Sequence, residues 1–111
     1  MTEYELIITV VNRGFADEVM AAARKAGASG GTVVNAKGAG TPELRKFFGT
    51  VIQPERELVL ILVRHEARRP IMEAIANETG LGSEARGLCF SLPVDSVKGI
   101  SLPEPDDEKE A

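Results

Sequence analysis

The 111-residue sequence is poor in several residue types that carry chemistry in other proteins. It has no tryptophan, one tyrosine, one histidine and one cysteine. A lone cysteine excludes an intramolecular disulfide, and the apolar run around Cys89 favours a buried core thiol over a nucleophile. One histidine and one cysteine are also a poor ligand set, so no metal site is expected. His65 lies in a charged turn and is expected to be solvated.

Long hydrophobic runs are missing as well. No apolar stretch approaches the ~18 to 20 residues that a membrane-spanning helix needs. The first residues, Met1 to Glu5, are acidic where a signal peptide would be basic, so a cytoplasmic protein is expected. The hydrophobic fraction of 43% and charged fraction of 27% are ordinary for a globular domain, and the length suits one domain with one modest core.

The net charge of −4 comes from one segment of the chain. From Pro103 onward there are five acidic residues and one lysine, and without them 12 acidic and 12 basic residues remain. The body therefore has no basic field that would attract nucleic acid. Residues 101–111 are rich in charge and nearly free of apolar residues, which predicts a disordered acidic tail after a domain at residues 1–100.

Hydrophobic periodicity divides that domain into four strands and two helices. Strands are predicted at 4–11, 32–37, 57–63 and 88–92, where β-branched and apolar residues gather. Helices are predicted at 15–26 and from the turn at 64–69 to Thr79, with Pro70 in the first turn. Residues 93–100 are expected to form a short final element. The order predicts the α+β class and a ferredoxin-like βαββαβ fold, in which a four-stranded antiparallel sheet carries both helices on one face.

Two of these strands are apolar on both faces. Leu6, Ile8 and Val10 alternate with Ile7 and Val11, and the strand at 57–63 has the same character. The helices cover only one face of the sheet. Leaving about five such side chains in water would forgo roughly 10 kcal/mol at ~25 cal/mol per Å². We therefore expect an oligomer in which the uncovered faces pack together.

Between the second and third strands, residues 38–55 show no convincing period. A connection this long in a small domain is usually functional. It contains apolar residues that need a surface to pack on, and two cations that would steer it toward an acidic partner. The predicted partner-binding residues of this loop are Arg45, Lys46, Phe47, Phe48, Val51 and Ile52.

A second loop, Thr79 to Gly87, holds three glycines and one arginine. Glycine lets a ligand approach backbone N–H groups closely, and an arginine adds a fixed positive fork for phosphate. A helix that ends at Thr79 with Gly80 just beyond it explains the first glycine without a ligand. Both interpretations remain open from the loop alone.

Taken together, these features resemble the nitrogen regulatory PII signal-transduction superfamily over residues 4 to 100. The resemblance is carried by Thr32-Val33, by Lys37-Gly38-Ala39-Gly40 at the base of the long loop, by Pro54, and by Thr79-Gly80-Leu81-Gly82 with Arg86-Gly87. It implies a homotrimer with an adenine nucleotide, AMP, ADP or ATP, in clefts between subunits. It also implies a long loop that reaches for a target, such as a membrane transporter or a metabolic enzyme.

The resemblance implies a set of nucleotide-binding residues. Thr32 and the backbone near Leu62 and Val63 would hold the adenine. Gly38 and Gly40 would let the loop base approach the nucleotide. The phosphates would be cradled by Gly80, Gly82, Arg86 and Gly87. If the resemblance is left aside, Thr32 is explained equally well as a strand residue whose hydroxyl is solvated.

The departures from the family pattern narrow its function. Tyr4 is the only tyrosine, so the family's modified tyrosine in the long loop is absent. Pro42 and Glu55 fall where the family has a glutamine and a lysine that serve 2-oxoglutarate, and a glutamate would repel a dicarboxylate. Where the family has paired arginines that meet the outer phosphates, this chain has the region of Lys98-Gly99-Ile100. The smaller number of cations per site favours AMP or ADP over ATP.

Three functions are weighed on this basis. The first is a non-enzymatic regulator that couples nucleotide binding to the order of the long loop. The second is a small phosphatase or nucleotide hydrolase, for which Glu84 is the one carboxylate inside the glycine loop. The third is a metal-responsive protein like the related trimeric copper-tolerance family, which the lack of ligands disfavours.

Overall fold

A computed structural model describes residues 3–39 and 54–99. The elements are β1 (Tyr4–Asn12), α1 (Ala16–Lys25), β2 (Thr32–Lys37), β3 (Glu55–Arg64), the short 3-10 helix η1 (His65–Ala67), α3 (Arg68–Thr79) and β4 (Leu88–Val94). This order confirms the predicted succession of strands and helices. Most of the predicted long loop and the whole predicted tail lie outside the described residues.

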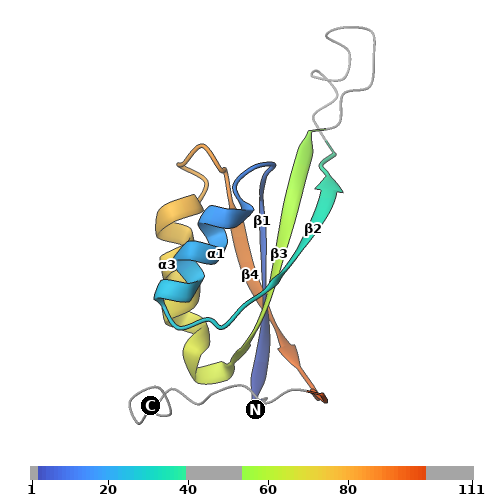
Figure 1. The fold of residues 1–111 in the computed structure, drawn as a ribbon, viewed down its shortest axis with the longest axis vertical. Helices are drawn as coiled ribbons and strands as arrows, with labels where there is room; N and C mark the ends of the chain where they lie inside the picture. Colours follow the sequence, from blue (N-terminus) through green and yellow to red (C-terminus); the bar gives the residue numbers. More distant parts are fainter. Residues whose placement is uncertain (1–2, 40–53, 100–111) are drawn as a thin grey trace, which may run out of the picture.

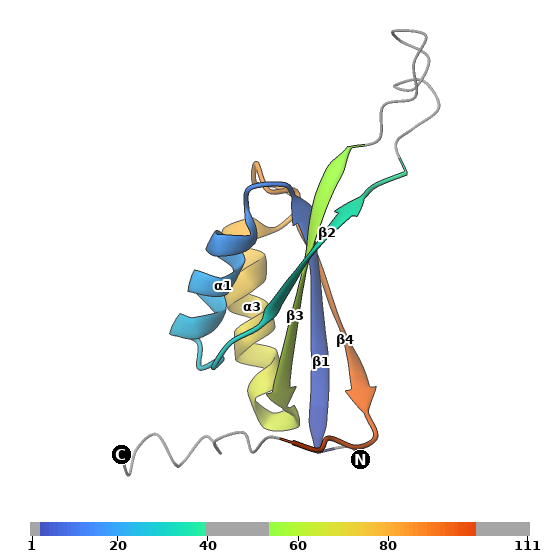
Figure 2. The ribbon, with the colours of Figure 1, turned by 45° about the vertical axis from the view of Figure 1, so that its right-hand side comes forward.

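The four strands form one antiparallel sheet in the order β2-β3-β1-β4. Both helices lie on the same side of it, and the ends of β2 and β3 that flank the long loop project past them (Figure 1). Figure 2 shows the other side of the sheet with no helix over it. The predicted α+β ferredoxin-like fold is confirmed.

The pairing register assigns each strand residue to a face, because directly opposed residues in antiparallel strands point the same way. Ile7 opposes Ile61 and Val11 opposes Glu57. Along β1 every second residue is buried, starting with Glu5, and the others are partly exposed. The buried side chains face the helices, so every second residue of β1 contributes to the core.

The core lies between this face and the two helices. Its members are apolar and nearly solvent-free. Strands β1 and β3 each contribute one side of their alternation, and helices α1 and α3 each contribute one stripe: Ile7, Val11, Val59, Ile61, Val63, Val19, Met20, Ala23, Ile71 and Ile75. At about 1.5–3 kcal/mol for each fully buried large aliphatic side chain, this cluster is the main source of the domain's stability.

A carboxylate on β3 caps the start of α1. The Glu57 Oε1 accepts hydrogen bonds from the N–H groups of Gly14, at 2.9 Å, and Ala16, at 3.2 Å. Ala16 is the first residue of the helix and Gly14 lies just before it, and the helix has no side-chain cap of its own at Phe15. A negative charge here also complements the helix dipole, together with Asp17 and Glu18.

The prediction of a separate final element from Pro93 is wrong. Pro93 and Val94 belong to β4, opposite Glu5 and Tyr4 of β1, and residues 95–99 form neither helix nor strand. Proline is tolerated because β4 is an edge strand, where one side of the backbone needs no partner in the sheet.

The helix-free side of the sheet, called here the open face, is apolar across all four strands. The register places on it Leu6, Ile8 and Val10 of β1, the three leucines of β3 at 58, 60 and 62, Val34 of β2, and Leu88, Phe90 and Leu92 of β4. On β4 these side chains are 40% to 55% exposed. No described residue covers this face, so the two-sided character read from the sequence corresponds to a real apolar surface.

Candidate nucleotide site

The turn between β1 and α1 joins the two loops that the sequence singled out. The Asn12 N–H donates to the carbonyl of Ala85, and the Asn12 Nδ2 donates to the carbonyl of Glu84, both at 2.9 Å. The next N–H, of Arg13, donates to the Glu55 carbonyl at 3.2 Å. The glycine loop and the base of the long loop are therefore anchored through adjacent residues at the same end of the sheet.

Two successive turns shape the glycine loop. The Ser83 N–H donates to the Gly80 carbonyl at 3.0 Å, and the Arg86 N–H donates to the Ser83 carbonyl at 3.1 Å. The N–H groups of Gly82 and Glu84 take no part in closing these turns. A Cβ on Gly82 would meet nothing within 4 Å. Gly82 is thus the glycine of this loop at which a ligand can reach the backbone from open space.

The other two glycines are required by the fold itself. A Cβ on Gly87 would lie 2.1 Å from the Thr79 carbonyl oxygen, which accepts the Gly87 N–H at 2.7 Å. A Cβ on Gly80 would lie 2.5 Å from the Ala76 carbonyl oxygen. Gly80 ends α3 as expected, but with φ −68 and not in the left-handed region. Close packing accounts for both residues without a ligand.

Arg86 is the residue in this loop with a positive φ, of 48°. A non-glycine residue in the left-handed region is uncommon, and such positions gather at ligand sites. Its side chain is exposed and its backbone is held by the second turn. The guanidinium is consequently presented to solvent from a fixed backbone position.

Two of the residues expected around adenine, Thr32 and Leu62, line a hollow at the start of β2. This hollow has a volume of about 480 Å³ and is lined by Thr32 and the glycine pair before it, together with Leu6, Leu60, Leu62 and Ser29. Gly31 cannot carry a side chain freely, since its Cβ would lie 2.9 Å from the Leu60 carbonyl oxygen. Thr32, Leu60 and Leu62 place the hollow at the edge of the open face. The Val63 side chain points into the core, so Val63 has only its backbone to offer, as expected.

The base of the long loop is closed by a hydrogen bond from the Gly38 N–H to the Pro54 carbonyl, at 2.7 Å. The Glu55 carboxylate forms a salt bridge with the Arg13 guanidinium, and the hydrogen bond that Arg13 donates to Glu55 raises the pKa of Arg13. Because Arg13 offsets the charge of Glu55, this carboxylate repels a dicarboxylate less than the sequence alone indicates. Gly40 and the predicted partner residues of the long loop, Arg45, Lys46, Phe47, Phe48, Val51 and Ile52, lie outside the described part.

Within one chain the predicted residues form two groups. Gly38 and the loop of Gly80, Gly82, Arg86 and Gly87 lie at the end of the sheet marked by Asn12. Thr32 lies lower on the β2 edge, opposite Leu60, and β2 and β4 are the two outer strands.

His65 was expected to be solvated, and this is wrong. Its Nδ1 lies 2.8 Å from the Glu5 Oε2, and the two side chains are 34% and 8% exposed. Glu5 shares the alternation of Ile7 and Val11, which was the signal in the sequence that it faces inward. The pair lies at the opposite end of β1 from the glycine loop.

Cys89 lies on the helix side of β4, half-buried, and its Sγ accepts a hydrogen bond from the Thr9 hydroxyl at 3.5 Å. Burial raises the pKa of the Cys89 thiol, with a smaller opposing effect of Thr9. This agrees with a core thiol. Glu84 is exposed, and the side-chain hydrogen bonds of Cys89 and His65 within residues 3–39 and 54–99 go to Thr9 and Glu5.

Over residues 3–39 and 54–99 there is no group of three or more histidine, cysteine or acidic side chains that could hold a metal ion. Within those same ranges no helix is both long and apolar enough to cross a membrane.

Comparison with known proteins places the chain. A sequence model of the family described as nitrogen regulatory protein P-II matches residues 4–104. The chain belongs to the P-II family. Proteins of this family are generally regulators that bind adenine nucleotides and partner proteins, typically as trimers in the cytoplasm. A search of curated protein sequences finds no match.

Solved structures agree with this assignment at the level of the fold. PII of Arabidopsis thaliana, in a crystal structure with citrate bound, is 21% identical with a TM-score of 0.67, over 85% of this chain and 79% of that one. A Bacillus cereus protein related to NIF3 is 17% identical with a TM-score of 0.66, over 86% of this chain but 26% of that one. The P-II fold is therefore clear at low identity.

Proposed function

We propose that this P-II family chain is a non-enzymatic regulator that assembles as a homotrimer and binds an adenine nucleotide between its subunits. The observation that carries the proposal is the hollow beside Thr32, which opens at the edge of the uncovered apolar face. Burying that face against other copies would bring a second chain to the hollow. One chain alone supplies only part of its wall.

The two-loop arrangement supports a role in signalling. Nucleotide held by Gly82 and Arg86 would act on the glycine loop, which is hydrogen-bonded to Asn12. The next residue, Arg13, is hydrogen-bonded to Glu55 at the base of the long loop. A ligand shifts a loop only by its different affinity for the two loop states. The Asn12-Arg13 turn is a short physical route for such a difference, and loop 38–55 would present the result to a target protein.

The first experiment is calorimetric titration of the purified chain with AMP, ADP, ATP and cyclic AMP, alongside light scattering for the oligomeric state. We expect a trimer and binding of at least one of these nucleotides, with AMP or ADP preferred. A trimer that binds none of them at millimolar concentration would refute nucleotide sensing. A monomer at micromolar concentration would refute the assembly.

The phosphate assignment has its own test. Arg86→Ala is expected to weaken nucleotide binding about tenfold, the loss expected for one charge-assisted hydrogen bond. Arg24→Ala, on the exposed side of α1, removes the same charge elsewhere and should leave affinity unchanged. Equal affinities for both variants would remove Arg86 from the site.

A further inference from the structure

Asn12, the last residue of β1, makes three hydrogen bonds that hold turns in place. Its carbonyl accepts from the Phe15 N–H at 3.3 Å, in the turn before α1. Its N–H and its side-chain Nδ2 donate to the glycine loop, to the carbonyls of Ala85 and Glu84, each at 2.9 Å. Any residue except proline could supply the backbone donor, but the side-chain bond depends on this residue being asparagine.

The two carbonyls belong to consecutive peptide units directly before Arg86. Because a peptide unit is planar, a hydrogen bond to its carbonyl restrains the orientation of the whole unit. The Asn12 side chain restrains the unit between Glu84 and Ala85, and the Asn12 N–H restrains the unit that follows. That second unit is also held at its other end, where the Arg86 N–H donates to the Ser83 carbonyl at 3.1 Å. The backbone that leads into Arg86 is therefore restrained over two successive peptide units.

Arg86 needs such restraints because its φ of 48° lies in the left-handed region. A residue other than glycine stays in this region only where its surroundings hold it there. On one side of Arg86 the Ala85 residue is 1% exposed, and on the other the Gly87 N–H donates to the Thr79 carbonyl at 2.7 Å. The Asn12 amide adds a side-chain bond that comes from a different element, β1.

We propose that Asn12 is a positioning residue for the phosphate side of the nucleotide site: its amide holds the glycine loop in the shape that presents the exposed Arg86 side chain to the ligand. The proposal rests on the proposed function, because it takes Arg86 as the group that meets the phosphate. A guanidinium on a fixed backbone loses less freedom on binding than one on a mobile loop, so the affinity that it contributes depends on the order of the loop. Asn12 needs no contact with the nucleotide itself.

Hydrogen exchange followed by mass spectrometry tests the first step on the full chain without ligand. Asn12→Ala removes the amide donor, and Asn12→Asp keeps the shape of the side chain but at neutral pH offers the Glu84 carbonyl only acceptors. Both variants should exchange faster than the parent in residues 80–87. Asn77→Ala, exposed on α3, is the matched control and should leave this exchange unchanged. Unchanged exchange in both Asn12 variants would overturn the proposal.

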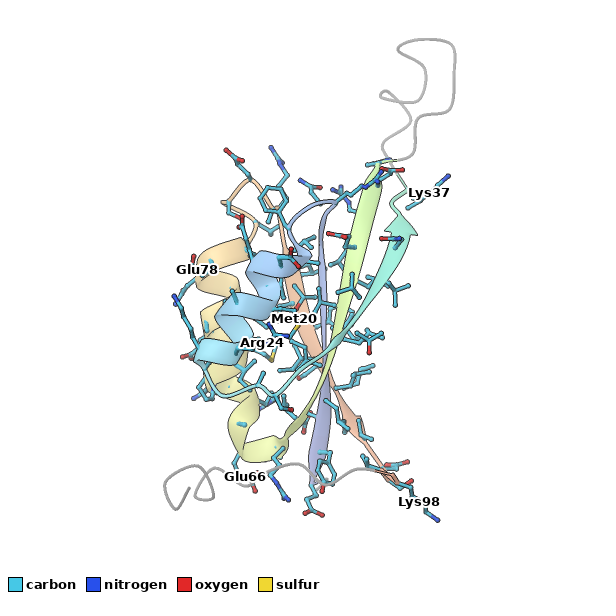
Figure 3. The ribbon with its side chains drawn as sticks, in the orientation of Figure 1. Met20, Arg24, Lys37, Glu66, Glu78 and Lys98 are labelled. Atoms are coloured by element: carbon cyan, nitrogen blue, oxygen red, sulfur yellow. The ribbon has the colours of Figure 1, made fainter. Side chains whose placement is uncertain are left out.

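Calorimetry with AMP and ADP tests the second step through a double-mutant cycle. Asn12→Ala and Arg86→Ala should each weaken binding about tenfold. In the Asn12→Ala chain, Arg86→Ala should cost only about twofold more, because the guanidinium is no longer held in place and residues in one network are coupled. A purely structural role of Asn12 would leave the contribution of Arg86 unchanged. Arg24, which Figure 3 shows on α1, is the control, and Arg24→Ala should leave affinity unchanged in both backgrounds.

Two binding results would overturn the role of Asn12. One is an Asn12→Ala chain that binds AMP and ADP as tightly as the parent. The other is a double variant whose loss is the product of the single losses, about a hundredfold, since the two residues would then act independently. A parent that binds no nucleotide would refute the nucleotide function and the phosphate role of Asn12 together. A parent that binds nucleotide beside either of the first two results refutes Asn12 alone, so the two failures are distinguishable.

Discussion

At the scale of single residues, the glycine loop combines two different uses of glycine. Gly87 and Gly80 are confined by carbonyl oxygens of α3, whereas Gly82 is open to solvent. The sequence marks all three positions alike, because a glycine required by packing and one that admits a ligand look the same in one chain. Only the three-dimensional neighbours separate them.

Gly87→Ala is expected to destabilise the fold, because the new Cβ would overlap the Thr79 carbonyl oxygen and disturb a 2.7 Å hydrogen bond. The cost of such overpacking is typically about 1–3 kcal/mol. Gly82→Ala is the matched control and should change stability little, while it weakens nucleotide binding. Urea denaturation measures the first effect and calorimetry the second. Equal destabilisation by both substitutions would contradict this division.

Cys89 is expected to react slowly. A raised pKa lowers the thiolate fraction of Cys89 below that of a free thiol, and the thiolate is the reactive form. Alkylation by iodoacetamide should be slower in the native protein than in urea. Because the thiol ionises at lower pH in the unfolded chain than in the folded one, the free energy of unfolding falls as the pH rises above the unfolded pKa. Cys89→Ser should reduce that pH dependence. Equal rates in native and denatured protein would contradict the burial.

At the scale of elements, alternation in the sequence was enough to find the strands and to show that β1 and β3 are apolar on both sides. It also contained the signal for Glu5, which shares the alternation of Ile7. The partner of Glu5, by contrast, is His65, which follows β3 in the chain. No local pattern in the sequence predicts a contact 60 residues away. For the same reason the sequence did not reveal Glu57 as the cap of α1.

The cap gives a direct test. Glu57→Ala removes the acceptor for the N–H groups of Gly14 and Ala16 and should cost about 0.5–2 kcal/mol of stability, the range for lost helix caps. Glu57→Gln keeps an acceptor oxygen but loses the charge, so it should cost less. Chemical denaturation of the two variants, compared with Glu73→Ala on exposed α3 surface, measures the difference. A Glu57→Ala variant as stable as the parent would contradict the cap.

At the scale of the whole molecule, the open face is the surface through which the proposed trimer would form. Leu92 is 47% exposed at the edge of this face, on β4. Leu92→Glu should put a charge into the subunit contact and yield monomers or weaker trimers in light scattering, with circular dichroism unchanged. Ala76→Glu, exposed on α3, is the matched control and should remain trimeric. Intact trimers of Leu92→Glu would place the contact elsewhere.

The proline in β4 has a consequence for how copies can meet. Pro93 has no backbone N–H, and it interrupts the row of donors along the outer margin of the last strand. Another chain cannot simply continue the ladder there, so growth of an endless ribbon through this margin is hindered. In the proposed assembly, copies would instead meet through the side chains of their broad sheet faces, a geometry that can close into a finite ring.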